Sequence, residues 1–223
     1  MNKTMIIFKD ELRGFAKSGV MIGLWVGLPI VAILMFFFLP SPGPGIKIPM
    51  SYFIGTMIAS LGGGLAGIMV AVNIVNEKTK KVYDLFVIRP IRRGDIIWAK
   101  FFAVFICVTL ACILAMFTGV LVDLIQGHSM SPMQWKNLAE SLVSASMVIA
   151  VSISGGIVIG VIAPNVLLAV LLVLYGTQNL AIIPMAPTFF GLPDLLWVMS
   201  LISLVITFLL MLLAAYAFRK REM

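Results

Sequence analysis

The residues whose side chains could build a catalytic or metal site are few in this chain. His128 is the only histidine, and Cys107 and Cys112 are the only cysteines. The two cysteines share one apolar run and stand about 140° apart around a helix, so we expect buried free thiols without a disulfide or a metal. Because no nucleophile, base and acid can be grouped, the sequence predicts that the chain is not an enzyme and binds no cofactor or metal itself.

A second group with chemical potential is the basic segment between Asn76 and Lys100, which holds seven of the sixteen lysines and arginines. The seven are Lys78, Lys80, Lys81, Arg89, Arg92, Arg93 and Lys100. Such a segment can bind a soluble partner, or it can merely orient the neighbouring spans and contact anionic lipid headgroups. The spacing of residues within it favours the first interpretation.

Polar side chains inside apolar runs form a third group. Four of them fall together in the fifth run, namely Tyr175, Thr177, Gln178 and Asn179. Such residues can face a translocation pathway or a dimer interface, or they can hydrogen-bond neighbouring helices, and the sequence leaves both interpretations open. Asp123 and Glu140 lie near the outer ends of two runs, where we expect water to solvate them and no basic residue to pair with them.

The composition places these residues in a membrane protein. Hydrophobic residues make up 61% of the 223 residues, charged residues only 11%, and the mean hydropathy is +1.13. A soluble domain carries about a quarter charged residues. The net charge of +7 would suit a nucleic acid, but the basic residues flank apolar spans, so we expect no nucleic-acid partner. We expect residues 1–223 to form a single transmembrane domain.

Six apolar runs in the sequence are long enough to cross a bilayer, because a hydrocarbon core of about 30 Å requires about 20 helical residues. They are approximately residues 18–40, 52–75, 100–125, 138–163, 166–185 and 195–218. Between the fourth and fifth runs, Ala163-Pro164-Asn165 favours a tight turn over one long kinked helix. The predicted fold class is therefore all-α and integral to the membrane, with six transmembrane helices.

The distribution of basic residues orients these spans. With the N-terminus inside, fourteen of the sixteen basic residues face the cytoplasm, and only Lys47 and Lys136 lie outside. The positive-inside rule then predicts a multi-pass protein of the plasma membrane, with both termini and the loop of residues 76–99 in the cytoplasm.

Residues 1–17 precede the first span and show helical periodicity. An apolar stripe consists of Met1, Met5, Phe8, Leu12 and Phe15, and the residues pointing largely the other way are Lys3, Asp10, Arg13 and Lys17. We expect an amphipathic helix that lies in the cytoplasmic interface and contacts membrane lipids. Its role is either that of a passive anchor or that of a docking element.

The loop of residues 76–99 contains a second short amphipathic pattern. Its apolar residues at helical spacing are Val82, Leu85 and Phe86. Glu77 precedes Lys80 and Lys81 by three and four residues, the favourable order for ion pairs within a helix. We expect the helix to stop near Arg89, because Pro90 disfavours helical geometry in the residue before it. The third helix begins either near Lys100 or already between Arg92 and Asp95.

Glycines are concentrated in the second and fourth runs. They are Gly62, Gly63, Gly64 and Gly67, and then Gly155, Gly156 and Gly160. The spacing includes small residues four positions apart, which predicts close packing of helices rather than a substrate site.

The loop resembles that of ABC-2-type permeases, the membrane subunits of ATP-binding-cassette exporters. The resemblance lies in Glu77, the basic stretch after it, Asp84-Leu85-Phe86, Arg89-Pro90-Ile91, Ile96 and Lys100. The amphipathic N-terminal helix, the six spans and the basic C-terminus also fit that family. The chain departs from better-studied relatives in its short outer loop around residues 186–194, so their substrates do not carry over.

The resemblance implies an export permease whose loop helix couples it to a separate ATPase subunit. The implied coupling residues are Glu77, Lys80, Lys81, Val82, Leu85, Phe86, Arg89 and Pro90. The sequence contains no Gly-x-x-x-x-Gly-Lys-Ser/Thr loop, so ATP and Mg are expected on the ATPase subunit. A second permease copy or a paralogue is implied, and an apolar or amphipathic substrate such as a drug, lipid or peptide is expected. The alternative is a scaffold subunit that transmits ATPase strokes without moving a solute.

Overall fold

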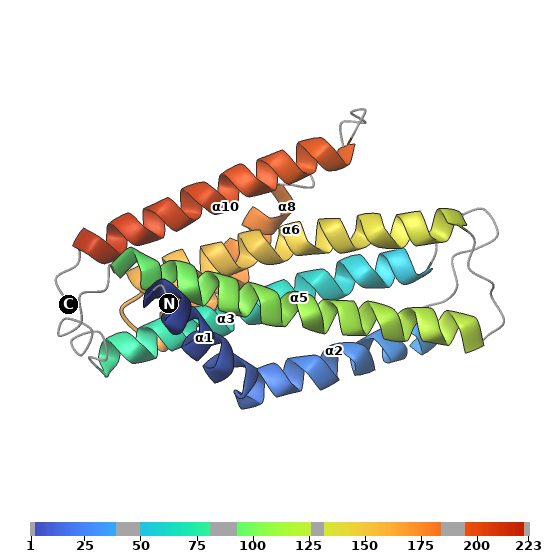
Figure 1. The fold of residues 1–223 in the computed structure, drawn as a ribbon, viewed down its shortest axis with the longest axis horizontal. Coiled ribbons are helices and arrows are strands. Elements are labelled where there is room, and N and C mark those ends of the chain that lie inside the picture. The colour runs from blue at the N-terminus through green and yellow to red at the C-terminus, as the bar shows by residue number, and fades with distance from the viewer. Residues whose placement is uncertain (1–2, 39–49, 81–92, 126–131, 184–194, 221–223) are drawn as a thin grey trace.

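The computed structural model describes residues 3–38, 50–80, 93–125, 132–183 and 195–220, and every regular element within them is a helix. Several long helices run roughly along one axis and α1 crosses them near one end (Figure 1). The helices are α1 (Lys3–Ala16), α2 (Gly19–Phe38), α3 (Met50–Thr79), α5 (Arg93–Ile125), α6 (Pro132–Ile162), α7 (Val166–Leu172), the π-helix η1 (Val173–Thr177), α8 (Gln178–Ile182) and α10 (Leu195–Lys220).

Four helices within the described residues are long and apolar enough to cross a membrane by themselves. These stretches are Met57–Thr79, Gly94–Val122, Leu138–Ile162 and Leu196–Phe218. A fifth is reached if α1 and α2, which bend by 61° at their junction, count as one broken span. The apolar stretch Val166–Ala181 is shorter. The chain is therefore a helical, multi-pass membrane protein, as the composition predicts, and the number six stays a prediction.

Two helices extend further than their apolar runs. Helix α5 begins at Arg93 rather than near Lys100, and α6 begins at Pro132 rather than near residue 138. The start of α5 has Asp95 in its first turn, where a carboxylate interacts favourably with the helix dipole. Proline at the first position of α6 is likewise well suited to a helix start. Hydropathy locates the membrane-spanning part of a helix, whereas these terminal residues decide where the helix begins.

The predicted turn between the fourth and fifth runs is confirmed. Helix α6 ends at Ile162 and α7 begins at Val166. The backbone N–H of Leu168 donates to Asn165 Oδ1 at 2.8 Å, so Asn165 caps the new helix. A proline before such a cap cannot continue the preceding hydrogen-bond ladder, which is why the chain turns here.

Helices α3 and α6 are packed at backbone distance, as the glycine spacing predicts. A Cβ added to Gly156 would lie 2.5 Å from Gly67 O and 2.7 Å from Gly67 Cα. One turn further along, a Cβ on Gly160 would lie 2.9 Å from Ala71 Cα. Only glycine permits these approaches, so the two helices form a close-packed pair at the centre of the bundle.

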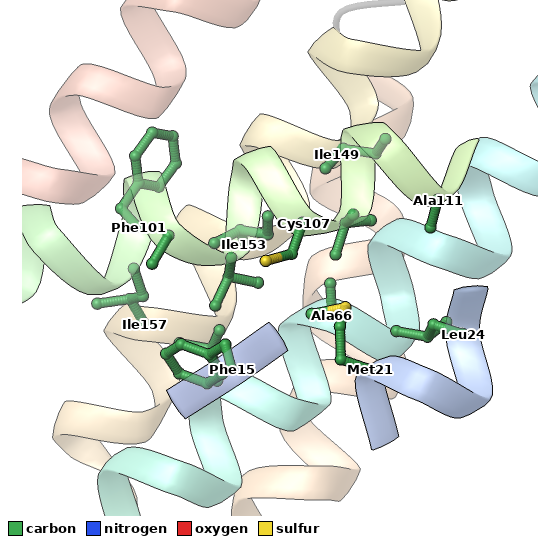
Figure 2. Close-up of a cluster of buried hydrophobic side chains, with 14 of the residues drawn as sticks. Phe15, Met21, Leu24, Ala66, Phe101, Cys107, Ala111, Ile149, Ile153 and Ile157 are labelled. Carbon is green, nitrogen blue, oxygen red and sulfur yellow. The ribbon is translucent and has the colours of Figure 1, made fainter. Parts of the chain in front are cut away.

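A continuous apolar core joins this pair to α1, α2 and α5. Figure 2 shows Phe15 of α1, Met21 and Leu24 of α2, and side chains of the three longer helices gathered in one cluster. Cys107 belongs to that core, and both cysteines are buried free thiols, as predicted. Helix α2 is further tied to α5 because Trp25 Nε1 donates to Cys107 O at 3.0 Å.

Helix α10 lies at the edge of the bundle (Figure 1). Only 22% of its most apolar stretch is buried inside the protein, compared with 72% for the corresponding stretch of α6. It is held by Ser203 Oγ, which donates to Met147 O at 3.2 Å, and by Phe208 against Trp98 with ring centroids 6.4 Å apart. Helix α10 is therefore mostly exposed at the surface of the bundle, whereas α6 is central.

One end of the bundle collects α1, the last turn of α3, the first turns of α5, the α6–α7 turn and the last turn of α10 (Figure 1). We call it the α1 end. It also carries most of the basic side chains that the structure describes, with Lys136 near the opposite end.

Candidate functional site: a buried ion cluster at the α1 end

The α1 end contains a lysine that is almost completely buried. Lys100 lies near the start of α5, and only 1% of its surface is exposed to solvent. Its Nζ is 2.8 Å from Glu11 Oε1 on α1 and 2.7 Å from Glu77 Oε1 on α3. A buried ammonium is tolerated only when carboxylates or other acceptors replace its water. We call these three residues the ion cluster.

The ring of Phe15 completes the surroundings of this ammonium. Lys100 Nζ lies 5.6 Å from the centre of the Phe15 ring, within the range of a cation–π contact. Phe15 is 2% exposed and belongs to the apolar core, so it shields one side of the ion cluster from water. The ion cluster therefore joins α1, α3 and α5 around a buried ammonium.

Burial has a measurable consequence for Glu11. Desolvation raises the pKa of its carboxyl above the ordinary value of 4.5, although the charge and hydrogen bond of Lys100 act in the opposite direction. The carboxylates of Glu77 and Asp10 raise this pKa further. The attraction of Lys100 therefore does not fully offset the loss of water around Glu11.

A second lysine ties the end of α3 to the α6–α7 turn. Lys78 Nζ donates to Ala163 O at 3.2 Å and to Val161 O at 3.4 Å. Carbonyl groups in the last turn of a helix lack hydrogen-bond donors within that helix, and a lysine is a favourable donor to them. The end of α3 is thus fixed to α5 through Glu77 and to α6 through Lys78.

Of the predicted coupling residues, only Glu77 and Lys80 lie within the described residues. Glu77 pairs with Lys100, a partner 23 residues away that the helical spacing to Lys80 does not reveal. Lys80 is exposed just after α3. The others lie outside the described residues: Lys81, Val82, Leu85, Phe86, Arg89 and Pro90.

The polar residues of the fifth run point in different directions. Gln178 reaches α3, where Ser60 Oγ donates to Gln178 Oε1 at 3.3 Å. Thr177 is buried and donates to Val173 O within its own helix at 2.7 Å. Asn179 donates to Tyr175 O, and the Tyr175 side chain is 74% exposed. Gln178 thus forms an interhelical hydrogen bond, whereas Tyr175 and Asn179 face outward.

Glu140 has a basic neighbour, contrary to our expectation. Lys136 Nζ lies 3.9 Å from Glu140 Oε1, one turn earlier on α6. The sequence signal was present, because lysine and glutamate four positions apart share a helix face. The side chain of Asp123 lies outside the described residues.

The ion cluster combines two carboxylates with one ammonium, an arrangement that links three helices. Within the described part of the chain, no three histidine, cysteine, aspartate or glutamate residues come together as metal ligands. Sequence analysis singled out Glu77 but missed the role of Glu11. The available signal was Lys100 itself, a lysine followed by an apolar run, which requires a carboxylate partner.

Comparison of the sequence with protein-family models gives no match, and comparison with curated proteins gives none either. What can be said of function therefore follows from the residues and the geometry of the α1 end.

Proposed function

We propose that this chain is the transmembrane permease subunit of an ATP-driven exporter of the ABC-2 type. In this proposal it has six spans with both termini in the cytoplasm, and it pairs with a second copy or a paralogue in the plasma membrane. A separate ATPase subunit holds ATP and Mg and acts on the cytoplasmic coupling loop of residues 76–99. The pair of permease subunits moves an apolar or amphipathic substrate outward.

The observation that carries the proposal is the position of the ion cluster at both ends of the basic segment. Glu77 stands at the start of that segment on α3, Lys100 stands at its end on α5, and their charged atoms are 2.7 Å apart. A force on the segment is therefore delivered to α3 and α5 together. The contact between Lys100 and Glu11 delivers the same force to α1.

The force also has a route to the centre of the bundle. Lys78 links the end of α3 to the α6–α7 turn. The close approach of Gly67 and Gly156 prevents α3 and α6 from sliding past each other without a clash. A displacement at the α1 end thus moves α3 and α6 as one body, as a rocking mechanism of alternating access requires.

The proposed fifth span consists of α7, η1 and α8. The stretch Val166–Ala181 has the length of about 24 Å at 1.5 Å per residue, somewhat short of a hydrocarbon core of about 30 Å. It contains a π-helical turn, a feature that is often found at functional sites. We propose that Tyr175 and Asn179, which face outward, meet the second permease copy or the translocation pathway.

Co-purification with the ATPase subunit tests the coupling. The variant carrying Leu85→Asp and Phe86→Asp should insert into the membrane normally but lose the ATPase subunit. Trp135→Asp is a matched control, since Trp135 is exposed near the opposite end of α6. Normal recovery of the ATPase subunit with the loop variant would refute the proposed docking site.

A second measurement separates transport from mere force transmission. The complex is reconstituted in liposomes, and ATP hydrolysis is measured with and without candidate amphipathic substrates. Stimulation of hydrolysis together with accumulation of the substrate inside inverted liposomes supports an exporter. Hydrolysis that no substrate changes, in a complex that retains its ATPase subunit, supports the scaffold alternative.

A further inference from the structure

Two adjoining cavities lie where the α1–α2 elbow meets α3. One has a volume of about 500 Å³ and the other about 710 Å³. Both fall in the range of about 300–1,000 Å³ that is typical of ligand sites. They share four lining residues, which are Ser18, Met69, Asn73 and Glu77, so together they form one groove along α3.

The end of the groove nearest α1 carries charges of both signs. Asp10, Glu11 and Glu77 contribute carboxylates to the smaller cavity, and Arg13 and Lys17 contribute cations. Arg13 and Lys17 stand four residues apart on and just after α1, so their side chains lie near one another. This end suits a ligand that carries a positive and a negative group close together.

The rest of the groove combines an apolar wall with two further polar residues, Asn76 and Lys80. The larger cavity is lined on this side by Val20, Leu65, Ile68, Met69 and Val72. From Asn73 back to Leu65, α3 rises by about 12 Å, which approaches the thickness of one leaflet, about 15 Å of a 30 Å core. An acyl chain that follows this part of α3 would contact apolar side chains over this length.

We propose that the groove binds a zwitterionic aminophospholipid of the leaflet at the α1 end. The ammonium of the headgroup is placed at Asp10, beside the carboxylates of Glu11 and Glu77 that contact Lys100. The phosphate is placed at Arg13 and Lys17, and one acyl chain along Leu65, Ile68 and Val72. A primary amine donates three hydrogen bonds to carboxylates, which a quaternary choline cannot do. An anionic headgroup without an amine meets the carboxylates unfavourably. The proposal does not depend on an ATPase partner or on transport.

Native mass spectrometry of the full-length protein in detergent tests this selectivity. Phosphatidylethanolamine, phosphatidylcholine and phosphatidylglycerol with identical acyl chains are titrated separately. We expect phosphatidylethanolamine to bind at least about tenfold more tightly than the others, because one charge-assisted hydrogen bond is worth about that factor. Equal affinity for all three lipids would overturn the proposal.

Variants locate the site within the groove. Lys17→Gln should weaken phosphatidylethanolamine binding about tenfold through the phosphate. Val72→Trp should weaken it by filling the acyl part without changing any charge. Lys9→Gln is the matched control, because Lys9 is exposed on α1 and does not line either cavity. Binding that neither Lys17→Gln nor Val72→Trp changes, in protein of normal thermal stability, would place the lipid elsewhere and overturn the proposal.

A second copy of the chain is the competing occupant of the groove. Val72→Cys, in a chain whose two native cysteines are changed to alanine, reports on it under oxidising conditions. The proposal requires that Val72→Cys forms no disulfide between copies and becomes protected from a thiol reagent when phosphatidylethanolamine is added. A disulfide between two copies at this position would show that protein fills the groove and would overturn the proposal.

Discussion

The substitution Lys100→Met removes the ammonium at the centre of the ion cluster while keeping a side chain of similar length. In the intact protein, Glu11 Oε1 and Glu77 Oε1 contact the same nitrogen at 2.8 Å and 2.7 Å. The two oxygens are therefore no more than about 5.5 Å apart. Without the ammonium, two carboxylates face each other at the edge of an apolar core.

The magnitude of the loss follows from two independent estimates. At 5.5 Å and an effective dielectric constant of about 20, the repulsion between two unit charges is roughly 3 kcal/mol. Protonation relieves that repulsion, and for a carboxyl with an ordinary pKa of 4.5 it costs about 3 kcal/mol at pH 7 and less than about 1 kcal/mol at pH 5. Because each carboxylate side chain is about one-fifth exposed, we expect a net loss of about 2–3 kcal/mol at pH 7.

Thermal unfolding of the purified protein in detergent, followed by tryptophan fluorescence, measures this loss. For a chain of this size, about 1 kcal/mol lowers the Tm by about 2–4 °C. Lys100→Met should therefore lower the Tm by about 4–12 °C at pH 7 and by less than about 4 °C at pH 5. Adding Glu11→Gln should restore most of the Tm at pH 7. Lys136→Met, which changes an exposed lysine, is the control.

The difference between the two pH values is the critical result. A Tm that Lys100→Met leaves unchanged at pH 7 would refute the reasoning. So would a larger loss at pH 5 than at pH 7, because protonation of the carboxyls removes the repulsion on which the argument depends.

Three further changes test other parts of the structure. Because the folded-state pKa of Glu11 is raised, its protonated form stabilises the fold at low pH, and this contribution is lost as the pH rises from 4.5 through the folded-state pKa. Glu11→Gln should therefore raise the Tm relative to the wild type more at pH 8 than at pH 5. The reverse order would contradict the burial of this carboxyl. Gly156→Ala should lower the free energy of unfolding by about 1–3 kcal/mol in denaturant titrations, since the new methyl group meets the Gly67 backbone. Its control is Gly119→Ala, which has nothing within 4 Å of its added Cβ and should be neutral or stabilising. Replacing the whole ion cluster with methionines should leave the Tm unchanged or higher, yet abolish coupled ATP hydrolysis; a complex that remains fully coupled would show that the ion cluster is merely structural.

Local signals in the sequence predict much of the fold. The helix break at Ala163-Pro164-Asn165 depends on a proline and a cap within three residues, and the structure places it there. The packing of Gly67 against Gly156 follows from small residues at helical spacing in two separate runs. Both features are set by residue types whose effect hardly depends on the rest of the chain.

The ion cluster could not be predicted in the same way. Helical spacing links Glu77 to Lys80 and Lys81 but does not reveal Lys100, which Glu77 contacts in the structure. Glu11 joins the same lysine from a distance of 89 positions along the chain. Helical spacing predicts neighbours on one helix, whereas these contacts depend on how α1, α3 and α5 are arranged around a core. The packing of Phe15, together with Phe8 and Leu12, against that core brings Glu11 to the buried lysine.

The ion cluster is better explained by the register that it fixes among three helices than by a gain in folding stability. Buried ion pairs are often no more stable than apolar residues of the same volume, and the raised pKa of Glu11 shows that desolvation is not fully offset here. Apolar contacts among α1, α3 and α5 would hold the helices together but would tolerate sliding. Charged atoms 2.7–2.8 Å apart tolerate little sliding, because separating them leaves a buried charge without a partner. An arrangement that fixes the register of three helices at both ends of one basic segment is therefore suited to converting a push on that segment into a movement of the bundle.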